Sequence, residues 1–422
     1  MPASAETWLS ILLMALGVGA VSGGVYWTAG AVRIIRTVRR FPSGDDGAAL
    51  ALPDPAPPVC VVIPAHNEGH AIAGLIASLR AQTYPSFSVV LSLDRCTDDT
   101  DAVARAAIGG DPRFTIFPID ACPEDWAGKT HAVWRAVTDA PPAQGAPLLL
   151  FADADTQFHP DCVRAAVALL RQRSLGLLSF LSSLSVDRWY ELVAQPAAAL
   201  ELLRQYPLSS SNRWPKPRAF ANGQFMLFTR EAYDAAGGHQ AVRTHLLEDI
   251  AIARHTARAG HRTGVLPAGH MLHCRMYENW SAFRRGWRRI YTEAANRRSK
   301  RLAICARRVL LTLVLAPVAA ALALAVALPV AFDRSNDWLP WTVAALGLTS
   351  LGIYLFALAY LARVSKAPIW TAALQPLGGL LVADILLQAR RHLRRGRTSS
   401  WGGMSYNRAD RDHPADPGTT NL

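Results

Sequence analysis

Residues 59–68 read VCVVIPAHNE, an apolar run with strand character that ends in a polar segment. Helical periodicity follows over His70–Gln82, and Ser88–Leu93 is a second apolar strand that ends at Asp94. The alternation continues, with strands expected at Phe114–Pro118 and Pro147–Ala152 and helices at Asp101–Ala107 and Lys129–Thr138. Strands that alternate with helices predict an α/β domain built on a mainly parallel sheet.

The pattern is more mixed after this point. A helix is expected at Asp161–Arg173, strand character at Ser174–Leu184 and a helix at Tyr190–Tyr206. We place the whole domain at residues 59–300. The Pro/Gly/Ala/Asp-rich segment before it, residues 41–58, predicts an irregular tether.

Of the 422 residues, 51% are apolar, a high share that predicts membrane segments. Long apolar runs lie on both sides of the α/β domain. Residues 1–40 form an N-terminal anchor around the uncharged run Trp8–Val32. Residues 301–390 form a C-terminal membrane region with spans at Val309–Phe332 and Leu339–Ala362, each long enough to cross about 30 Å of hydrocarbon. A further run, Ala367–Ala383, contains Pro376, Gly378 and Gly379. These residues predict a re-entrant or interfacial hairpin of two short helices.

Positive residues set the expected topology, because Lys and Arg beside a span favour the cytoplasm. They cluster after the anchor, before the second span and in the basic tail, residues 391–422, whose end from Arg408 onward is expected to be disordered. We therefore expect an integral protein of the cell inner membrane with a cytoplasmic domain. The net charge of +12 is assigned to lipid contact and not to nucleic acid.

Acidic residues follow three of the predicted strands. Glu68 closes the first polar segment, Asp94 follows the second strand, and Asp153 and Asp155 follow the run LLLF at 148–151. Ligands of open parallel sheets sit outside the carboxyl ends of the strands. One acidic residue there is commonly a turn or a helix cap, but the recurrence at three strand ends predicts a ligand site.

With these residues the chain resembles the family 2 glycosyltransferases, whose Rossmann-like α/β fold, called GT-A, binds nucleotide sugars. The resemblance covers about residues 59–291 and rests on six motifs in order: PAHNE at 64–68, DRCTDDT at 94–100, WAGKTHA at 126–132, DAD at 153–155, NGQF at 222–225 and LED at 247–249. The flanking membrane segments make it most similar to enzymes that glycosylate carotenoids, hopanoids or ceramide.

The resemblance implies a donor side and a divalent metal, Mg²⁺ or Mn²⁺. Asp155 would be the direct metal ligand and Asp153 would touch the ribose or the metal waters; an Asx turn is the alternative for this pair. Lys129, at a helix start after Gly128, would bind the donor diphosphate, unless it is an ordinary solvated lysine. The other donor-binding residues implied are Pro64, Ala65, Glu68 and Asp94.

The resemblance also implies a base and an acceptor side. Asp249, with Glu248 raising its pKa, would take the proton of the acceptor hydroxyl during displacement with inversion. An acceptor that is already ionised would need no strong base, and a helix-capping pair is the structural alternative for these two acids. The acceptor side is assigned to Asn222, Gly223, Gln224 and Trp287.

The segment near 278–300 carries an aromatic stripe at helical spacing, bordered by arginines. This pattern fits an interfacial helix and a core helix equally well. Processive relatives carry an Arg-Trp pair here, whereas Gly286 precedes Trp287 in this chain. We therefore expect transfer of one sugar, from a UDP-linked donor, to a membrane lipid. The alternatives are a processive polysaccharide synthase and a non-catalytic nucleotide-sugar-binding membrane protein.

Overall fold

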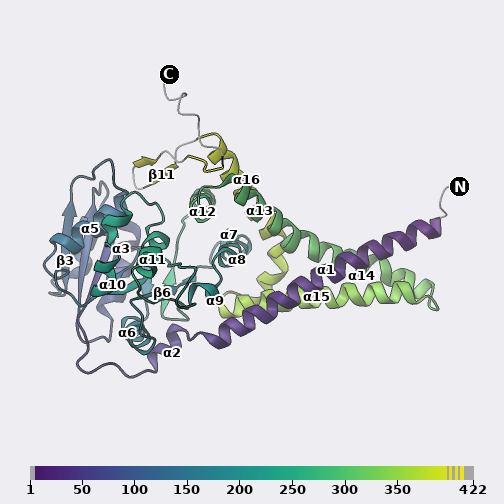
Figure 1. The fold of residues 1–422 in the computed structure, drawn as a ribbon, viewed down its shortest axis with the longest axis horizontal. Helices are drawn as coiled ribbons and strands as arrows, with labels where there is room; N and C mark the ends of the chain where they lie inside the picture. Colours follow the sequence, from purple (N-terminus) through teal and green to yellow (C-terminus); the bar gives the residue numbers. More distant parts are fainter. Residues whose placement is uncertain (1–4, 397–398, 402–403, 407–408, 413–422) are drawn as a thin grey trace, which may run out of the picture.

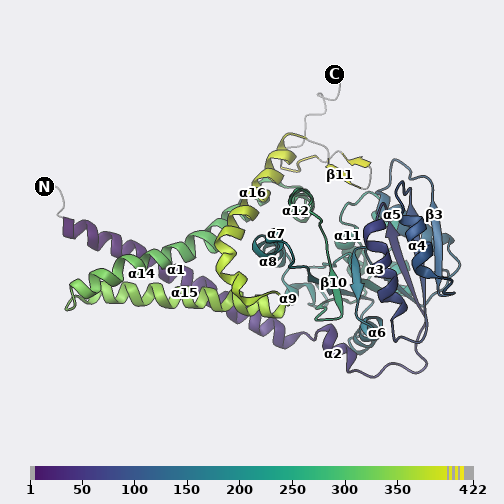
Figure 2. The ribbon, with the colours of Figure 1, turned by 180° about the vertical axis from the view of Figure 1, so that it is seen from behind.

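The computed structural model describes residues 5–396, 399–401, 404–406 and 409–412. An α/β domain lies at one end of the molecule, and three long helices extend from it to the other end, where the N-terminus lies (Figure 1). Helices α12, α7 and α8 lie between these two parts (Figures 1 and 2).

The main sheet of the described residues has seven strands in the order β3-β2-β1-β4-β8-β6-β9. Neighbours are parallel except β8, which is antiparallel to β4 and β6. The strands are β1 (Val59–Ala65), β2 (Phe87–Asp94), β3 (Phe114–Ile119), β4 (Leu148–Phe151), β6 (Leu177–Leu181), β8 (Met226–Thr229) and β9 (Thr263–Pro267). The expected mainly parallel α/β sheet is confirmed, and β1 and β4 are apolar throughout because both faces of the sheet are covered.

Helices of the domain cover the two faces of this sheet, except α7 and α8, which lie between the sheet and the helix bundle. They are α3 (Gly69–Arg80), α4 (Thr100–Ile108), α5 (Gly128–Asp139), α6 (Cys162–Gln172), α7 (Trp189–Val193), α8 (Gln195–Gln205), α9 (Leu208–Ser211), α10 (Arg230–Ala235), η1 (His239–Val242) and α11 (Glu248–Arg258). A small sheet has the order β5-β10-β7, formed by β5 (Thr156–Phe158), β7 (Ser183–Leu184) and β10 (Leu272–Cys274). The strand expected at Ser174–Leu184 is thus divided between two sheets.

The membrane bundle contains α1 (Ala5–Arg40), α14 (Ala316–Asp333) and α15 (Trp338–Val364). Small residues let these helices approach closely: a Cβ added at Gly23 would lie 3.1 Å from Ala316 Cβ, and Ser350 Oγ donates to the Ala20 carbonyl at 2.8 Å. The three expected spans are confirmed as helices long and apolar enough to cross a membrane.

A π-helical turn, η2 (Leu310–Leu315), joins α13 (Ser299–Val309) to α14. Pro317 has no N–H to donate to the Leu313 carbonyl. The π turn also replaces the usual i to i+4 backbone hydrogen bonds of the helix with i to i+5 bonds. Tyr354 Oη donates to the Leu313 carbonyl at 3.3 Å, and Trp27 Nε1 donates to the Thr312 carbonyl at 2.9 Å. The two other spans therefore satisfy the carbonyls that this irregular turn leaves open.

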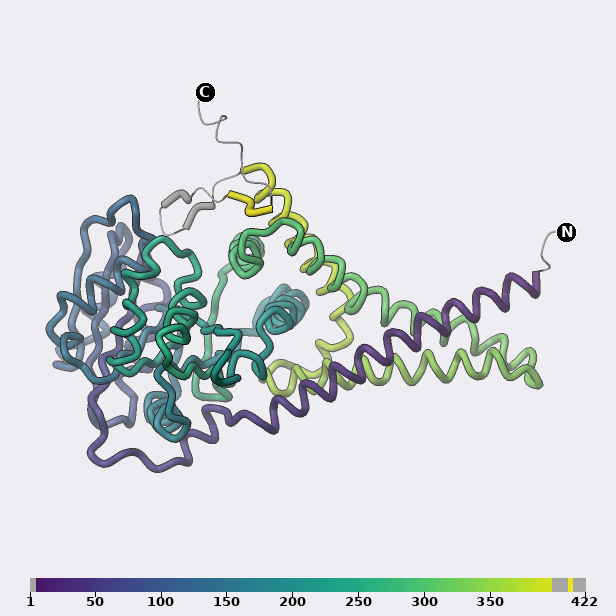
Figure 3. The backbone as a smooth tube through the Cα atoms, in the orientation of Figure 1, coloured from purple at the N-terminus to yellow at the C-terminus, as the bar shows by residue number. Residues whose placement is uncertain are grey.

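The prediction of two short helices after α15 is wrong. A 3₁₀ turn, η3 (Ile369–Leu374), leads into one continuous helix, α16 (Gln375–Arg394), which is itself long and apolar enough to span a membrane. Gly378 and Gly379 do not break it: an added Cβ would lie 2.1 Å from the Val193 carbonyl oxygen and 2.9 Å from Leu313 Cβ, respectively. These glycines permit close packing on α7 and η2. Helix α16 packs on α13, α12 (Trp280–Ala294) and α8, across the domain-facing end of the bundle (Figures 2 and 3).

Two further segments are more ordered than expected. The tether contains α2 (Gly44–Ala48), which begins with a Ser43–Asp46 capping box and packs on α6. Asp410, expected to be disordered, is buried and accepts from the Ser299 N–H at 3.2 Å at the start of α13. The tail also forms the strands β11 (Ser399–Trp401) and β12 (Met404–Tyr406). Residues 413–422 lie outside the described residues.

The aromatic stripe of α12 is buried: Phe283, Trp287 and Tyr291 are at most 2% exposed and pack within the protein. Its apolar face is therefore a core face, as one of the two sequence interpretations required.

Candidate active site

The ends of three adjacent strands bring the predicted acids together, because β2, β1 and β4 run parallel in neighbouring positions. Glu68, Asp94, Asp153 and Asp155 line one cavity with Lys129. Helix α11 contributes the acids Glu248 and Asp249 to the same cavity. The predicted donor side and the predicted base thus share one site.

Lys129 lies in the first turn of α5, and its Nζ is 2.6 Å from Asp153 Oδ1 and 2.7 Å from Glu248 Oε1. The expected alternative of a solvated lysine does not describe this side chain, which is only 17% exposed. Burial acts to lower the pKa of Lys129, but the two carboxylates outweigh burial and raise it. This ammonium therefore joins the strand-end acids to the LED acids.

Both carboxylate oxygens of Asp249 accept backbone hydrogen bonds. The Gly223 N–H donates to Oδ2 at 2.9 Å, and the Ile250 N–H donates to Oδ1 at 2.7 Å. A Cβ added at Gly223 would lie 3.0 Å from Lys129 Nζ and 3.4 Å from Asp249 Oδ2. Gly223 is therefore the position at which the NGQF segment contacts the acids.

Three acids of the site have raised pKa values. Burial, followed by the neighbouring Asp155 and Asp153, raises the pKa of Glu68 to about 8. Burial and Asp153 raise the pKa of Asp155 to about 7, and burial and Glu248 raise the pKa of Asp249 to about 7. A carboxyl group with a pKa near 7 is suited to accept a proton at neutral pH.

The carboxylates of Asp153 and Asp155 fit part of a divalent-metal shell. Asp155 Oδ1 is buried and makes no hydrogen bond with any described residue. No group of three or more His, Cys, Asp or Glu side chains within the described part of the chain forms a complete metal cage. Mg²⁺ commonly takes one or two carboxylates and completes its shell with waters and substrate phosphates, so these two residues suit a metal that arrives with a nucleotide.

Asp94, predicted to bind the donor, is paired with an arginine. The adjacent Arg95 donates to both of its oxygens, with Nε at 2.8 Å and Nη2 at 2.7 Å. The His66 ring nitrogen Nδ1 lies 2.6 Å from the Asp94 carbonyl oxygen, which fixes the loop between β1 and α3. The strand-end position of Asp94 was predicted, but its arginine partner was not.

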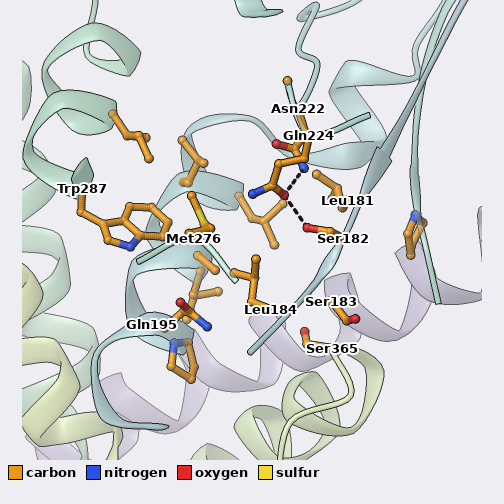
Figure 4. A pocket seen from close by; sticks show the side chains of 18 of the residues that line it. Leu181, Ser182, Ser183, Leu184, Gln195, Asn222, Gln224, Met276, Trp287 and Ser365 are labelled. Atoms are coloured by element: carbon orange, nitrogen blue, oxygen red, sulfur yellow. Dashed lines mark hydrogen bonds between the residues drawn. The ribbon is translucent and has the colours of Figure 1, made fainter. Parts of the chain in front are cut away.

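Asn222 and Gln224 of the NGQF segment and Trp287 of α12 form a further wall of the cavity. Gln224 Oε1 accepts from Asn222 Nδ2 at 2.9 Å and from Ser182 Oγ (Figure 4). Gln224 Nε2 donates to Cys274 Sγ at 3.0 Å. The indole of Trp287 faces the same cavity, and its buried Nε1 makes no hydrogen bond with a described residue. This wall offers polar groups beside an apolar surface.

The cavity, about 770 Å³ in volume, continues from the acids to the membrane helices. Leu181, Leu184, Met276 and Trp287 surround its apolar middle part (Figure 4). Residues of α1 and α15 line its far end, and these residues carry no motif by which the sequence could have identified them.

Comparison with known proteins identifies the family to which this chain belongs. The model of the family described as "Glycosyltransferase like family 2" matches residues 56–292, more than half of the chain. The chain belongs to this family, with a GT-A fold in its α/β domain and helices long and apolar enough to cross a membrane.

One similar curated protein is the 4,4'-diaponeurosporenoate glycosyltransferase of Staphylococcus aureus (strain MRSA252), 27% identical over 230 residues, which are 54% of this chain and 59% of that protein. The chain thus matches little more than half the length of the relative. Among solved structures, the mannosyltransferase PcManGT of Pyrobaculum calidifontis, in complex with GDP-Man and Mn²⁺, is 18% identical with a TM-score of 0.48, covering 91% of this chain and 98% of that chain. Glucosyl-3-phosphoglycerate synthase of Mycobacterium tuberculosis is 23% identical with a TM-score of 0.37, covering 57% and 80%.

Proposed function

We propose that this glycosyltransferase moves a single sugar, with inversion, from a nucleotide-sugar donor, UDP-linked, to a lipid acceptor in the membrane. The observation that carries the proposal is the continuous cavity, which has the acids at one end and α1 and α15 at the other. An acceptor held in the bilayer needs a path from the membrane to the sugar, and a fixed path supplies proximity.

The donor occupies the end with the strand-terminal acids in this proposal. Pro64, Ala65, Glu68 and Asp94 hold the nucleoside, and Lys129 binds the diphosphate. Asp153 and Asp155 would hold Mg²⁺ or Mn²⁺, which when bound neutralises negative charge on the departing diphosphate.

Asp249 is the proposed base. It takes the proton of the acceptor hydroxyl while that oxygen attacks the anomeric carbon on the face opposite the diphosphate, which inverts the configuration. Glu248 keeps the pKa of Asp249 high, in support of this role. Asn222, Gly223, Gln224 and Trp287 line the acceptor side, where the buried indole N–H of Trp287 makes no hydrogen bond with a described residue.

The enzyme is proposed to lie in the cell inner membrane with its catalytic domain in the cytoplasm. Three crossings by α1, α14 and α15 leave the catalytic domain and the C-terminal end of α16 at the same end of the bundle (Figure 1). In a variant with Ser399→Cys, a membrane-impermeant thiol reagent should label the protein only after cells are permeabilised. Labelling of intact cells would contradict this orientation.

Position 286 supports transfer of one sugar over processive synthesis. A Cβ at Gly286 would lie 2.2 Å from Tyr277 Oη, so the arginine of the processive motif has no room here.

To test the proposal, the purified protein is incubated with a membrane lipid extract, Mn²⁺ and UDP-hexoses, and the masses of the lipids are measured by mass spectrometry. One lipid should gain a single hexose, and NMR should show the inverted anomer. A ladder of additions would indicate a polymerase. Donor binding without hydrolysis or transfer would indicate a non-catalytic binding protein.

A further inference from the structure

The membrane end of the cavity is formed where α1 leaves the helix bundle. Seven α1 residues line it, and because they recur every three or four positions they form one helix face: Tyr26, Trp27, Gly30, Arg33, Ile34, Thr37 and Val38. This face spans roughly 18 Å at 1.5 Å per residue. Leu358, Leu361 and Ala362 of α15 also line the cavity, so its walls here are mainly apolar.

Arg204 of α8 is the charged group set into this apolar end. Its side chain is 13% exposed, and its guanidinium carbon lies 5.6 Å from the ring centroids of both Tyr26 and Trp27. Its Nη1 makes no hydrogen bond with a described residue and lies 4.0 Å from Glu201 Oε2. Arg204 lines the cavity, so a guanidinium whose acidic partner lies 4.0 Å away is part of its wall.

Glu201 does not neutralise Arg204, because Arg308 already binds it. Glu201 is completely buried, and both its oxygens accept from Arg308, including a bond from Nε to Oε2 at 3.2 Å. One acid and two guanidinium groups leave a positive charge of one in this cluster. Burial also lowers the pKa of Arg204, which shows that its surroundings disfavour the charge. An anion at the wall would relieve this imbalance.

We propose that Arg204 binds an anionic group, a carboxylate or a phosphate, carried by the lipid acceptor, whose hydrocarbon chain lies between α1 and α15. This inference rests on the proposed function and names the class of its acceptor. The planar guanidinium suits the paired oxygens of such a group, and the apolar residues of α1 and α15 that line the cavity suit the chain attached to it. The anionic group is at the membrane end of the cavity, so a separate hydroxyl reaches Asp249.

The test compares two probes of equal chain length, palmitate and hexadecanol, at pH 8 with the full-length protein in dodecyl maltoside. Palmitate should bind at least about tenfold more tightly, since one hydrogen bond to a charged group is worth roughly 1.5 kcal/mol or more. Arg204→Met should abolish this preference, and Arg204→Lys should keep part of it. Arg135→Met, which removes an exposed arginine of α5, is the matched control and should keep all of it.

Equal affinities of the native protein for the two probes would overturn the inference, as would a preference that survives Arg204→Met. Displacement of palmitate by millimolar inorganic phosphate would assign the site to a free anion and refute a lipid occupant. If Arg204→Met fails to fold, Glu201→Gln replaces it, because the added positive charge should increase the preference. Sugar transfer without a preference for palmitate would refute this inference and leave the proposed function standing. A preference for palmitate without sugar transfer would refute the proposed function and leave the anion site standing.

Discussion

Replacing Asp249 with asparagine separates its structural role from its chemical role. Both carboxylate oxygens accept a backbone N–H, at 2.9 Å from Gly223 and 2.7 Å from Ile250. An amide offers one oxygen, so one of these bonds is lost and an NH₂ group faces a backbone N–H. A bond to a charged acceptor contributes about 1.5–3 kcal/mol. Removing a charge beside Glu248 offsets part of that loss, so we expect the free energy of unfolding to fall by less than about 2 kcal/mol.

The chemical effect should be larger. Loss of a general base lowers kcat by about 10²–10⁴-fold, while donor affinity should change by less than about tenfold. The raised pKa of about 7 adds a pH signature: the base must be deprotonated, so kcat at saturating donor should fall as the pH drops below 7. In the asparagine variant the part of this dependence that Asp249 causes should disappear, and any part caused by Asp155 or Glu68 should remain.

The assay combines single-turnover transfer, donor titration and thermal unfolding. Asp111→Asn is the control, since both oxygens of Asp111 are also hydrogen-bonded, by Arg113, at a loop before β3 that is outside the site. It should lose stability and keep activity. If Asp249→Asn lowers kcat and donor affinity by the same factor, the residue is a helix cap or a donor contact and the reasoning fails.

Three further substitutions test other parts of the structure. Asp155→Ala should abolish transfer with little change in thermal unfolding, and near-native turnover with Mn²⁺ would show that the metal assignment is wrong. Gly286→Ala should lower stability by roughly 1–3 kcal/mol because its methyl group meets the Tyr277 ring, whereas an unchanged melting temperature would contradict the packing. Asp410→Ala should cost about 0.5–2 kcal/mol by uncapping α13, measured by thermal unfolding; no loss would mean that the tail does not hold the helix.

The strand-end acids could be predicted because their positions follow from local pattern. Apolar runs mark β1, β2 and β4, and parallel neighbours deliver Glu68, Asp94 and Asp153 to one edge of the sheet. The contact of Lys129 with Glu248 could not be predicted in this way. It depends on how the chain returns through β8, an antiparallel strand of four residues that is too short for periodicity to identify.

Other errors arose where tertiary neighbours override local preference. Gly378 and Gly379 have the composition of a helix break, but the carbonyl of Val193 and the side chain of Leu313 make small residues necessary inside a continuous helix. Arg204 belongs to no motif. Its role could not be predicted, because its surroundings form only where α1 and α13 pack against α8.

The short helix α2 makes the segment after α1 a rigid connection between that helix and the catalytic domain. Asp45 accepts from the His270 backbone N–H at 2.8 Å, and Lys366, just after α15, approaches the same carboxylate at 4.0 Å. The end of one span, the turn after another and a loop of the catalytic domain are thereby joined at one point. These contacts should limit the movement of the acids relative to the bilayer, so we expect the enzyme to glycosylate lipids whose hydroxyl lies at one set distance from the membrane surface.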